Sequence, residues 1–299
     1  MSGSQAVGFI GIGTMGWPMA ANLVKAGHAV TVNDIAAERA QAFAREHGAQ
    51  AASSNAALAR DADVVILMTP TSAADEAALS GPDGALAGLR KNALVIEMTS
   101  GNPSRTRELA QRVSEAGGLL IDAPVSGGVA RARTGELSIM VGGEQAEFAR
   151  AEPLLRAMGT TIVRTGGVAT AHAMKALNNL MSAAGFLIGA EALLIGKKFG
   201  LDPSTMVDIL NTSTGMNNST QRKFKQMVIS RSFDGGFGLD LMVKDLGIAL
   251  SIAQDTHTAA PFSSLCKEMW TAAATTLGPG REHTEMAKLS EQMAGVELK

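Results

Sequence analysis

Residues 6–23, AVGFIGIGTMGWPMAANL, decide the fold of this chain. The apolar run Val7–Gly11 leads directly into three glycines with the spacing G-x-G-x-x-G, and a helical pattern follows from Trp17. In such a strand–turn–helix unit, the first glycine permits the tight turn, the second lets a pyrophosphate approach the backbone, and the third lets helix and strand pack closely. The amides at the helix N-terminus then face the anion. This stretch predicts a dinucleotide-binding turn made by Gly11, Ile12, Gly13, Thr14, Met15 and Gly16.

An acidic residue stands where a dinucleotide turn needs one. The second apolar run, Ala29–Asn33, ends at Asp34, which lies 23 residues after Gly11. A carboxylate at this place can accept a hydrogen bond from the adenosine ribose 2′-OH. Ile35 follows it, where a protein that binds a 2′-phosphate would often carry arginine. The pattern favours NAD over NADP, although Arg39 leaves that choice open.

Short apolar runs alternate with alanine-rich helical segments through the first half of the chain. Runs of this kind, covered by helices on both faces, are typical of βαβ units and a mainly parallel sheet. The further candidate strands are Val64–Thr69, Ala93–Met98, Gly118–Ala123, Ser138–Val141 and Thr161–Arg164. Ligands of open α/β sheets bind outside the carboxyl ends of strands, so Thr69, Pro70 and Ser100 are candidate cofactor contacts. The alternative is that these residues serve only as turn or cap residues.

The pattern changes after Thr165. A proline-free helical stretch, Val168–Phe199, covers 32 residues, which is about 48 Å at 1.5 Å per residue. Further helical stretches are Pro203–Leu210, Leu239–Gln254 and Pro261–Leu277. We therefore predict an α/β Rossmann-type domain over residues 1–165 and an all-α substrate and oligomerisation domain over residues 166–299, joined by the long helix.

Composition excludes several classes of function. The 26 Lys and Arg against 28 Asp and Glu lack the basic excess of a nucleic-acid binder. The single cysteine, Cys266, forms no internal disulfide, and the five scattered histidines form no metal-binding pattern. The apolar stretch Ala176–Ala190 is too short for a membrane span, which needs about 20 apolar residues. We expect a cytoplasmic protein without a metal, a nucleic-acid partner or a membrane anchor.

Two features indicate chemistry on a small acid. In Asp122–Gly128, a serine and two glycines follow a strand, and the serine hydroxyl and the glycine N–H groups suit the binding of a carboxylate. The alternative is that this segment is an ordinary loop. Lys175 and Asn179 lie four residues apart on one face of the apolar helix. Desolvation lowers the pKa of a lysine, which suits it to acid/base catalysis, whereas a snorkelling lysine would only reach for water. Spacing alone does not rank Lys175 above Lys244.

The chain closely resembles the β-hydroxyacid dehydrogenase family, which includes 3-hydroxyisobutyrate dehydrogenases and tartronate semialdehyde reductases. The resemblance covers essentially the whole chain. Its four ordered motifs are GIGTMGWPMAANL at Gly11–Leu23, DAPVSGG at Asp122–Gly128 with Gly135 to Gly143 following, Lys175 to Asn179, and KDLG at Lys244–Gly247. It implies a fold like that of 6-phosphogluconate dehydrogenase and a homodimer or homotetramer built through the helical domain.

The resemblance also assigns roles to residues. It implies that Lys175 is the catalytic acid/base on the substrate hydroxyl. Ser126, Gly127 and Gly128 would bind the substrate carboxylate, and Asn179 would also contact the substrate. Lys244 would lie on the cofactor side of the cleft, near the nicotinamide, and Ser100 would contact the cofactor.

One departure from the family pattern precedes the lysine. The family carries G-x-x-G-x-G-x-x-x-K, and Ala169 and Ala171 replace two of these glycines. We expect the added methyl groups to push the helix start outward, and His172 to be a packing or surface residue.

The predicted function is NAD-dependent interconversion of a small β-hydroxy acid, of the 3-hydroxyisobutyrate, glycerate or threonate type, and its oxo acid or semialdehyde. The alternatives are reduction of succinic semialdehyde-type aldehydes or of imines, and a non-catalytic dinucleotide-binding module.

Overall fold

The parallel sheet expected from the apolar runs is present in the computed structural model, which describes residues 5–299. Strands β3-β2-β1-β4-β5-β6 are parallel neighbours. β8 is antiparallel to β6 and β7 and pairs with β9 in parallel. The strands are β1 (Ala6–Ile10), β2 (Ala29–Asn33), β3 (Gln50–Ala51), β4 (Val64–Leu67), β5 (Leu94–Glu97), β6 (Leu119–Asp122), β7 (Val125–Ser126), β8 (Leu137–Gly142) and β9 (Gly159–Gly166).

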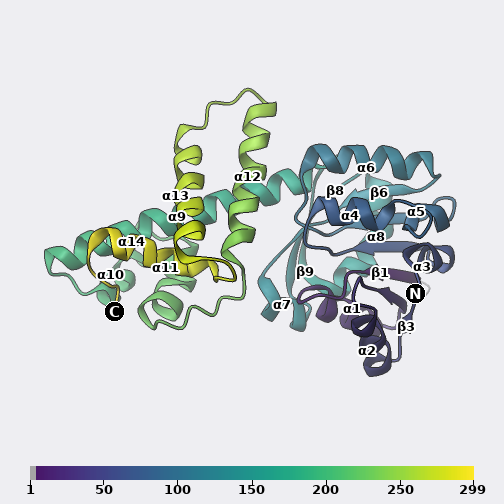
Figure 1. The fold of residues 1–299 in the computed structure, drawn as a ribbon, viewed down its shortest axis with the longest axis horizontal. Helices are drawn as coiled ribbons and strands as arrows, with labels where there is room; N and C mark the ends of the chain where they lie inside the picture. The colour runs from purple at the N-terminus through teal and green to yellow at the C-terminus, as the bar shows by residue number, and fades with distance from the viewer. Residues whose placement is uncertain (1–4) are drawn as a thin grey trace. The chain divides into compact units, whose positions relative to one another are not determined.

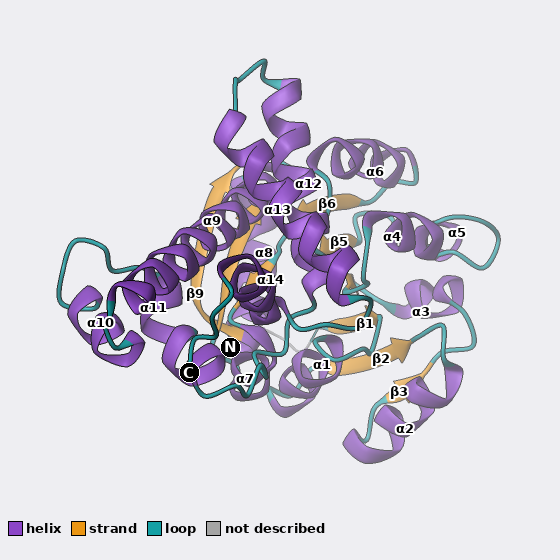
Figure 2. Ribbon diagram, turned by 60° about the vertical axis from the view of Figure 1, so that its left-hand side comes forward, coloured by secondary structure: helices purple, strands orange, loops and turns teal. Residues whose placement is uncertain are grey.

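Helices cover both faces of this sheet (Figures 1 and 2). In β4, Val64 and Ile66 pack into one core while Val65 and Leu67 pack into the other. All four are fully buried, which is why the strand reads as a continuous apolar run. One core lies under α1 (Gly16–Lys25), α2 (Ala37–His47), α7 (Gly128–Thr134) and α8 (Gln145–Met158). The other lies under α3 (Asn55–Asp61), α4 (Ser72–Leu79), α5 (Ala85–Gly88) and α6 (Pro103–Glu115).

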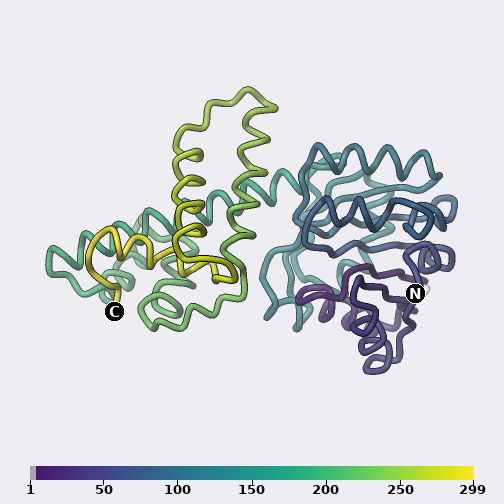
Figure 3. Tube along the Cα trace, in the orientation of Figure 1, coloured from purple at the N-terminus to yellow at the C-terminus, as the bar shows by residue number. Residues whose placement is uncertain are grey.

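The rest of the chain is helical, as predicted, and Figure 3 follows it along α9 (Thr170–Phe199). Its core surrounds Phe186, whose ring centroid lies 5.1 Å from that of Phe224 and 5.9 Å from that of Trp270. The other elements are α10 (Pro203–Leu210), α11 (Asn218–Arg222), a π-helical turn η1 (Phe224–Ile229), α12 (Leu239–Asp255), α13 (Pro261–Leu277), a 3₁₀ turn η2 (His283–Glu285) and α14 (Met286–Ala294). Helix α9 is long and apolar enough to cross a bilayer, but half of its most apolar window is buried inside the protein, as in a core helix.

Contacts divide the chain into two units, Met1–Lys175 and Ala176–Lys299. This division lies ten residues beyond the boundary expected at residue 165. β9 continues to Gly166, and Val168 packs into a core of the first unit. The start of α9 therefore belongs structurally to the α/β unit, and Lys175 is the last residue of that unit.

Candidate active site

The glycine turn after β1 has the geometry that its sequence predicts. Gly11 has φ +97°, and a Cβ on it would collide with the backbone carbonyl oxygen of Met68. A Cβ on Gly16 would collide with the carbonyl oxygen of Gly11. A Cβ at Gly13 would meet nothing within 4 Å. The first and third glycines are thus required by the turn itself, while the second leaves open space where a phosphate can approach the backbone.

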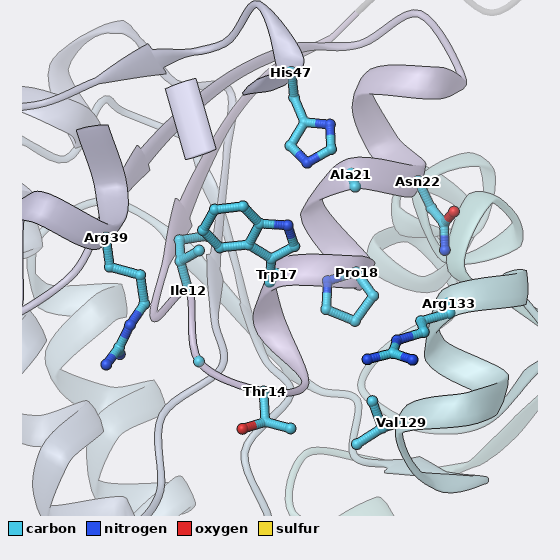
Figure 4. Close-up of a pocket in the computed structure, with 11 residues that line it drawn as sticks. Ile12, Thr14, Trp17, Pro18, Ala21, Asn22, Arg39, His47, Val129 and Arg133 are labelled. Atoms are coloured by element: carbon cyan, nitrogen blue, oxygen red, sulfur yellow. The ribbon is translucent and has the colours of Figure 1, made fainter. Parts of the chain in front are cut away.

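A cavity of about 610 Å³ adjoins this turn and is formed wholly by the first unit. Gly13 and Thr14 line it, and Arg39 and Arg133 lie on opposite sides of the Trp17 ring (Figure 4). Two guanidinium groups and the N-terminus of α1 provide the positive charge that a pyrophosphate requires. The donors and the open space at Gly13 fit a dinucleotide.

Asp34 connects the end of β2 to the glycine turn. Its Oδ2 accepts the backbone N–H of Ile12 at 2.8 Å, and its Oδ1 accepts that of Ala36 at 2.9 Å. Arg39 forms an ion pair with the same carboxylate at 3.2 Å. The Asp34 side chain is only 5% exposed, so it fixes the turn as well as offering lone pairs to a ribose hydroxyl.

The ends of β4 and β5 are tied together by hydroxyl groups. The backbone N–H of Thr69 donates to Thr99 Oγ1 at 2.9 Å, and both threonine hydroxyls donate to Asp75 Oδ1, at 2.9 and 3.0 Å. The hydroxyl of Thr69 is therefore engaged inside the protein. Its expected contact with a cofactor would come from the backbone of Thr69 and Pro70.

Ser126 ends β7, and Gly127 and Gly128 lead from it into α7. Gly127 has φ +131° and Gly128 has φ +68°, backbone conformations that favour glycine. A Cβ on Gly127 would also meet the Arg131 side chain at 2.8 Å. Successive N–H groups in such a turn form a concave anion site, and the half-buried Ser126 hydroxyl stands beside it.

Asp122 fixes the start of α9. Its Oδ1 accepts the N–H of Ala169 at 2.6 Å, and its Oδ2 accepts the N–H of His172 at 2.8 Å. Burial raises the pKa of Asp122 to about 6, although these two N–H groups favour the charged form. Because Asp122 ends β6, it holds the helix that carries Lys175 against the sheet.

A second contact to the same helix turn comes from β5 and α6. His172 is buried, and its Nδ1 lies 2.8 Å from Thr106 Oγ1 and 3.9 Å from Glu97 Oε2. A Cβ on Gly101 would lie 2.9 Å from both His172 Cε1 and Glu97 Oε1. Burial, with the neighbouring Asp75 and Asp122 carboxyls, raises the pKa of Glu97 well above its usual range. As expected, His172 is a packing residue.

In the second unit, Asn179 of α9 is held by an acid on α12. Its Nδ2 donates to Asp245 Oδ2 at 2.6 Å, and its Oδ1 accepts from Asn178 Nδ2 at 3.1 Å. Lys244 Nζ lies 3.3 Å from Asp245 Oδ1. The buried Asp245 therefore brings together two of the predicted site residues, Asn179 and Lys244.

Two family models cover almost the whole chain. Residues 6–167 match the NAD binding domain of 6-phosphogluconate dehydrogenase, and residues 169–290 match the NAD-binding domain of NADP-dependent 3-hydroxyisobutyrate dehydrogenase. The chain belongs to the β-hydroxyacid dehydrogenase family. This β-hydroxyacid dehydrogenase is an NAD(P)-dependent oxidoreductase, and its fold is that of 6-phosphogluconate dehydrogenase-like proteins, as predicted.

Individual relatives agree with this family. The chain is 35% identical to 2-(hydroxymethyl)glutarate dehydrogenase of Eubacterium barkeri, over 100% of this chain and 99% of the relative. It is 38% identical to 3-hydroxyisobutyrate dehydrogenase of Pseudomonas aeruginosa, over 90% and 92% of the two chains. The solved structure of Mycobacterium tuberculosis 3-hydroxyisobutyrate dehydrogenase with L-serine matches with a TM-score of 0.88 at 31% identity, covering 96% of this chain and 99% of that one.

Several residues that position this dehydrogenase's site were not singled out from the sequence. Asp122 opens the quoted DAPVSGG motif and Asp245 follows Lys244, so both had a local signal as acids inside apolar stretches. Asp75 and Glu97 had none, because their partners lie far along the chain.

The structure also explains why the family carries glycine at position 169. Ala169 has φ +77°, a backbone conformation that costs alanine about 1–2 kcal/mol.

Proposed function

We propose that this dehydrogenase interconverts a small β-hydroxy acid and its oxo acid or semialdehyde, with Lys175 as the acid/base and NAD as the preferred cofactor. Lys175 carries the proposal, because only 9% of it is exposed and it projects from a helix whose start is held by Asp122. A lysine placed so deeply in a fixed helix turn suits proton transfer at one defined position.

The chain's own residues divide the work. Ser126 and the backbone N–H groups of Gly127 and Gly128 would bind the substrate carboxylate and so orient the hydroxyl-bearing carbon. Lys175 would take the hydroxyl proton in oxidation and return it in reduction. Asn179, held by Asp245, would donate to the substrate. The nicotinamide cofactor, when bound, supplies the hydride acceptor or donor.

Residues of the first unit would hold the cofactor. The turn Gly11–Gly16 would bind the pyrophosphate, Asp34 the adenosine ribose, and the loops at Thr69–Pro70 and Ser100 the nicotinamide half. Lys244 would act from the helical unit near the nicotinamide. The choice of NAD rests on Asp34, because a carboxylate accepts from a 2′-OH and repels a 2′-phosphate.

A substrate panel tests the reaction. NADH and NADPH formation at alkaline pH would be compared for 3-hydroxyisobutyrate, glycerate, threonate, 3-hydroxypropionate, 4-hydroxybutyrate and 2-(hydroxymethyl)glutarate. We expect turnover of at least one β-hydroxy acid, and a loss of about 10²–10⁴-fold in Lys175→Ala with NADH affinity retained. Near-normal activity in that variant would overturn the assignment of Lys175. Activity confined to 4-hydroxybutyrate would favour succinic semialdehyde as the substrate, and silence of the whole panel would direct the search to imines.

We also propose that the chain forms a homodimer or homotetramer through its helical unit. Helix α9 exposes apolar side chains at Met174, Leu177, Met181, Ile188 and Ile195, a spacing that places them along one stripe. Such a stripe is typical of a surface covered by a partner helix. We expect light scattering to give an oligomer for the wild type and a smaller species for Met181→Glu/Ile188→Glu.

A further inference from the structure

Lys223 is a buried cation that the proposed reaction does not use. It directly follows α11 and is only 9% exposed. Its ammonium donates to Ser182 Oγ at 3.1 Å and lies 5.9 Å from the centroid of the Phe186 ring. Among residues 5–299, no carboxylate oxygen lies within 4.0 Å of this ammonium. Glu282 acts on it only from farther away, and its own carboxylate accepts from Thr284.

A buried ammonium with one hydroxyl partner is costly. Charges inside proteins are normally paired, because an ion that loses its hydration without gaining a partner is strongly disfavoured. Burial lowers the pKa of Lys223 to about 8, partly opposed by Glu282, so the group is still mainly charged at pH 7. An anion beside it would complete the missing pair.

The partner of Lys223 lies on the helix face that carries the reaction. Ser182 comes three residues after Asn179 and seven after Lys175, so all three project from one side of α9. At 1.5 Å per residue, Lys175 and Ser182 are about 10 Å apart along the axis. This is the length scale of a small dicarboxylic acid together with the side chains that contact it.

The polar segment before Lys223 holds it against α9. Asn217 caps α11 by accepting from the N–H groups of Ser219 and Thr220, and its Nδ2 donates to the carbonyl of Gly185 on α9 at 3.4 Å. The N–H of Lys223 donates to the carbonyl of Ser219 at 3.0 Å, which places the two residues one helical turn apart. Ser219 Oγ is buried and has no hydrogen-bond partner within the described part of the chain.

We propose that Lys223, with the hydroxyls of Ser182 and Ser219, binds a second carboxylate at the far end of the hydroxy-acid substrate. The inference rests on the proposed function and deepens it, because it makes the preferred substrate a β-hydroxy dicarboxylate. The distal carboxylate would lie at Lys223, on the side of α9 that carries Asn179 and Ser182. An ammonium and two hydroxyls are donors that match a carboxylate's lone pairs.

The test compares two acids that differ in one group. 2-(Hydroxymethyl)glutarate carries a distal carboxylate where 2-(hydroxymethyl)pentanoate carries a methyl group. We expect wild-type kcat/KM to favour the diacid by about 10–100-fold, the value of one charge-assisted contact. In Lys223→Met this ratio should fall to within about threefold of one, mainly through KM. Ser182→Ala, a smaller change, should lower the ratio by about 3–10-fold.

Lys225→Met is the matched control, since Lys225 lies two residues away and pairs with Asp208. The ratio should stay at its wild-type value in this variant. A wild-type enzyme without preference, or a Lys223→Met variant that keeps it, would overturn the inference. If neither acid is turned over, the proposed function fails for these acids and calorimetry with glutarate decides the inference separately. Binding that weakens about tenfold or more in Lys223→Met supports the anion site, and equal or absent binding contradicts it.

Discussion

The carboxylate of Asp122 accepts the backbone N–H of His172 at 2.8 Å, across 50 residues of sequence. Together with its bond from Ala169, this contact fixes the first turn of α9 to the end of β6. Lys175 follows His172 by three residues, so the position of the proposed acid/base is set by a strand rather than by a loop. Such support from a rigid element is what a proton-transfer group needs.

Asp122→Asn should change how stability depends on pH. The pKa of Asp122 is raised from 3.8 to about 6 in the folded state, so the folded protein binds more protons than the unfolded chain between these values. The corresponding stability is present below pH 3.8 and is lost as pH rises through about 6. The free energy of unfolding of Asp122→Asn, taken relative to that of wild type, should therefore rise by about 2 kcal/mol from pH 4.5 to pH 7. Urea unfolding at both pH values measures this gain, and a constant difference between the proteins would contradict it.

Ala169 and Ala171 are both fully buried, but they should respond differently to glycine. Ala169 has φ +77°, whereas Ala171 lies inside α9. Ala169→Gly relieves about 1–2 kcal/mol of backbone strain, which offsets the loss of its buried methyl group. Ala171→Gly also loses a buried methyl group, and it adds the cost of a helical glycine. We expect Ala171→Gly to unfold at a lower denaturant concentration than Ala169→Gly, by about 1–2 kcal/mol. Equal losses would mean that the left-handed residue carries no strain.

Much of the fold follows from local sequence. The strand Ala29–Asn33 and the helices Pro203–Leu210 and Pro261–Leu277 have the bounds that their patterns predict. Proline begins both helices, a position that its fixed φ favours. The strands β3 and β7 were not predicted, since two residues are too few to show a periodicity. Helix α14 was also missed.

The candidate site was less accessible from sequence. Glycine spacing predicts a turn because the requirement is local, and Gly11 and Gly16 indeed tolerate no Cβ. The contacts that hold the lysine helix are long-range pairs, such as Thr106 with His172, and no sequence period encodes them. Lys223 shows the same limit, because a lysine in a polar segment resembles a surface lysine until Ser182 and Phe186 are placed around it.

Asp34→Ser should shift cofactor preference toward NADP. The Asp34 carboxylate repels a 2′-phosphate and also engages Arg39, so its removal lowers the repulsion and frees the guanidinium. We expect the kcat/KM ratio of NAD to NADP to fall by about 10–100-fold, as measured with both cofactors at fixed substrate. Asp63→Ser is the control, because it also removes an acid that pairs with an arginine, here Arg90 at the surface. An unchanged ratio in Asp34→Ser would place the ribose elsewhere.

Lys223→Met should make the protein more stable at pH 7. Burial lowers the pKa of this lysine from 10.5 to about 8, so the charged form is disfavoured in the folded state. Between those values the unfolded chain binds more protons, and wild-type stability rises with pH. Methionine removes the charge at similar volume, so the free energy of unfolding should be about 1–3 kcal/mol higher in the variant than in wild type at pH 7. At pH 9.5 this difference in the free energy of unfolding should be smaller by about 2 kcal/mol, because the wild-type lysine is then largely neutral in the folded state. Denaturant unfolding at both pH values measures the gap, with Lys225→Met as the surface control. A variant less stable than wild type at pH 7 would show that the ammonium's contacts outweigh its desolvation.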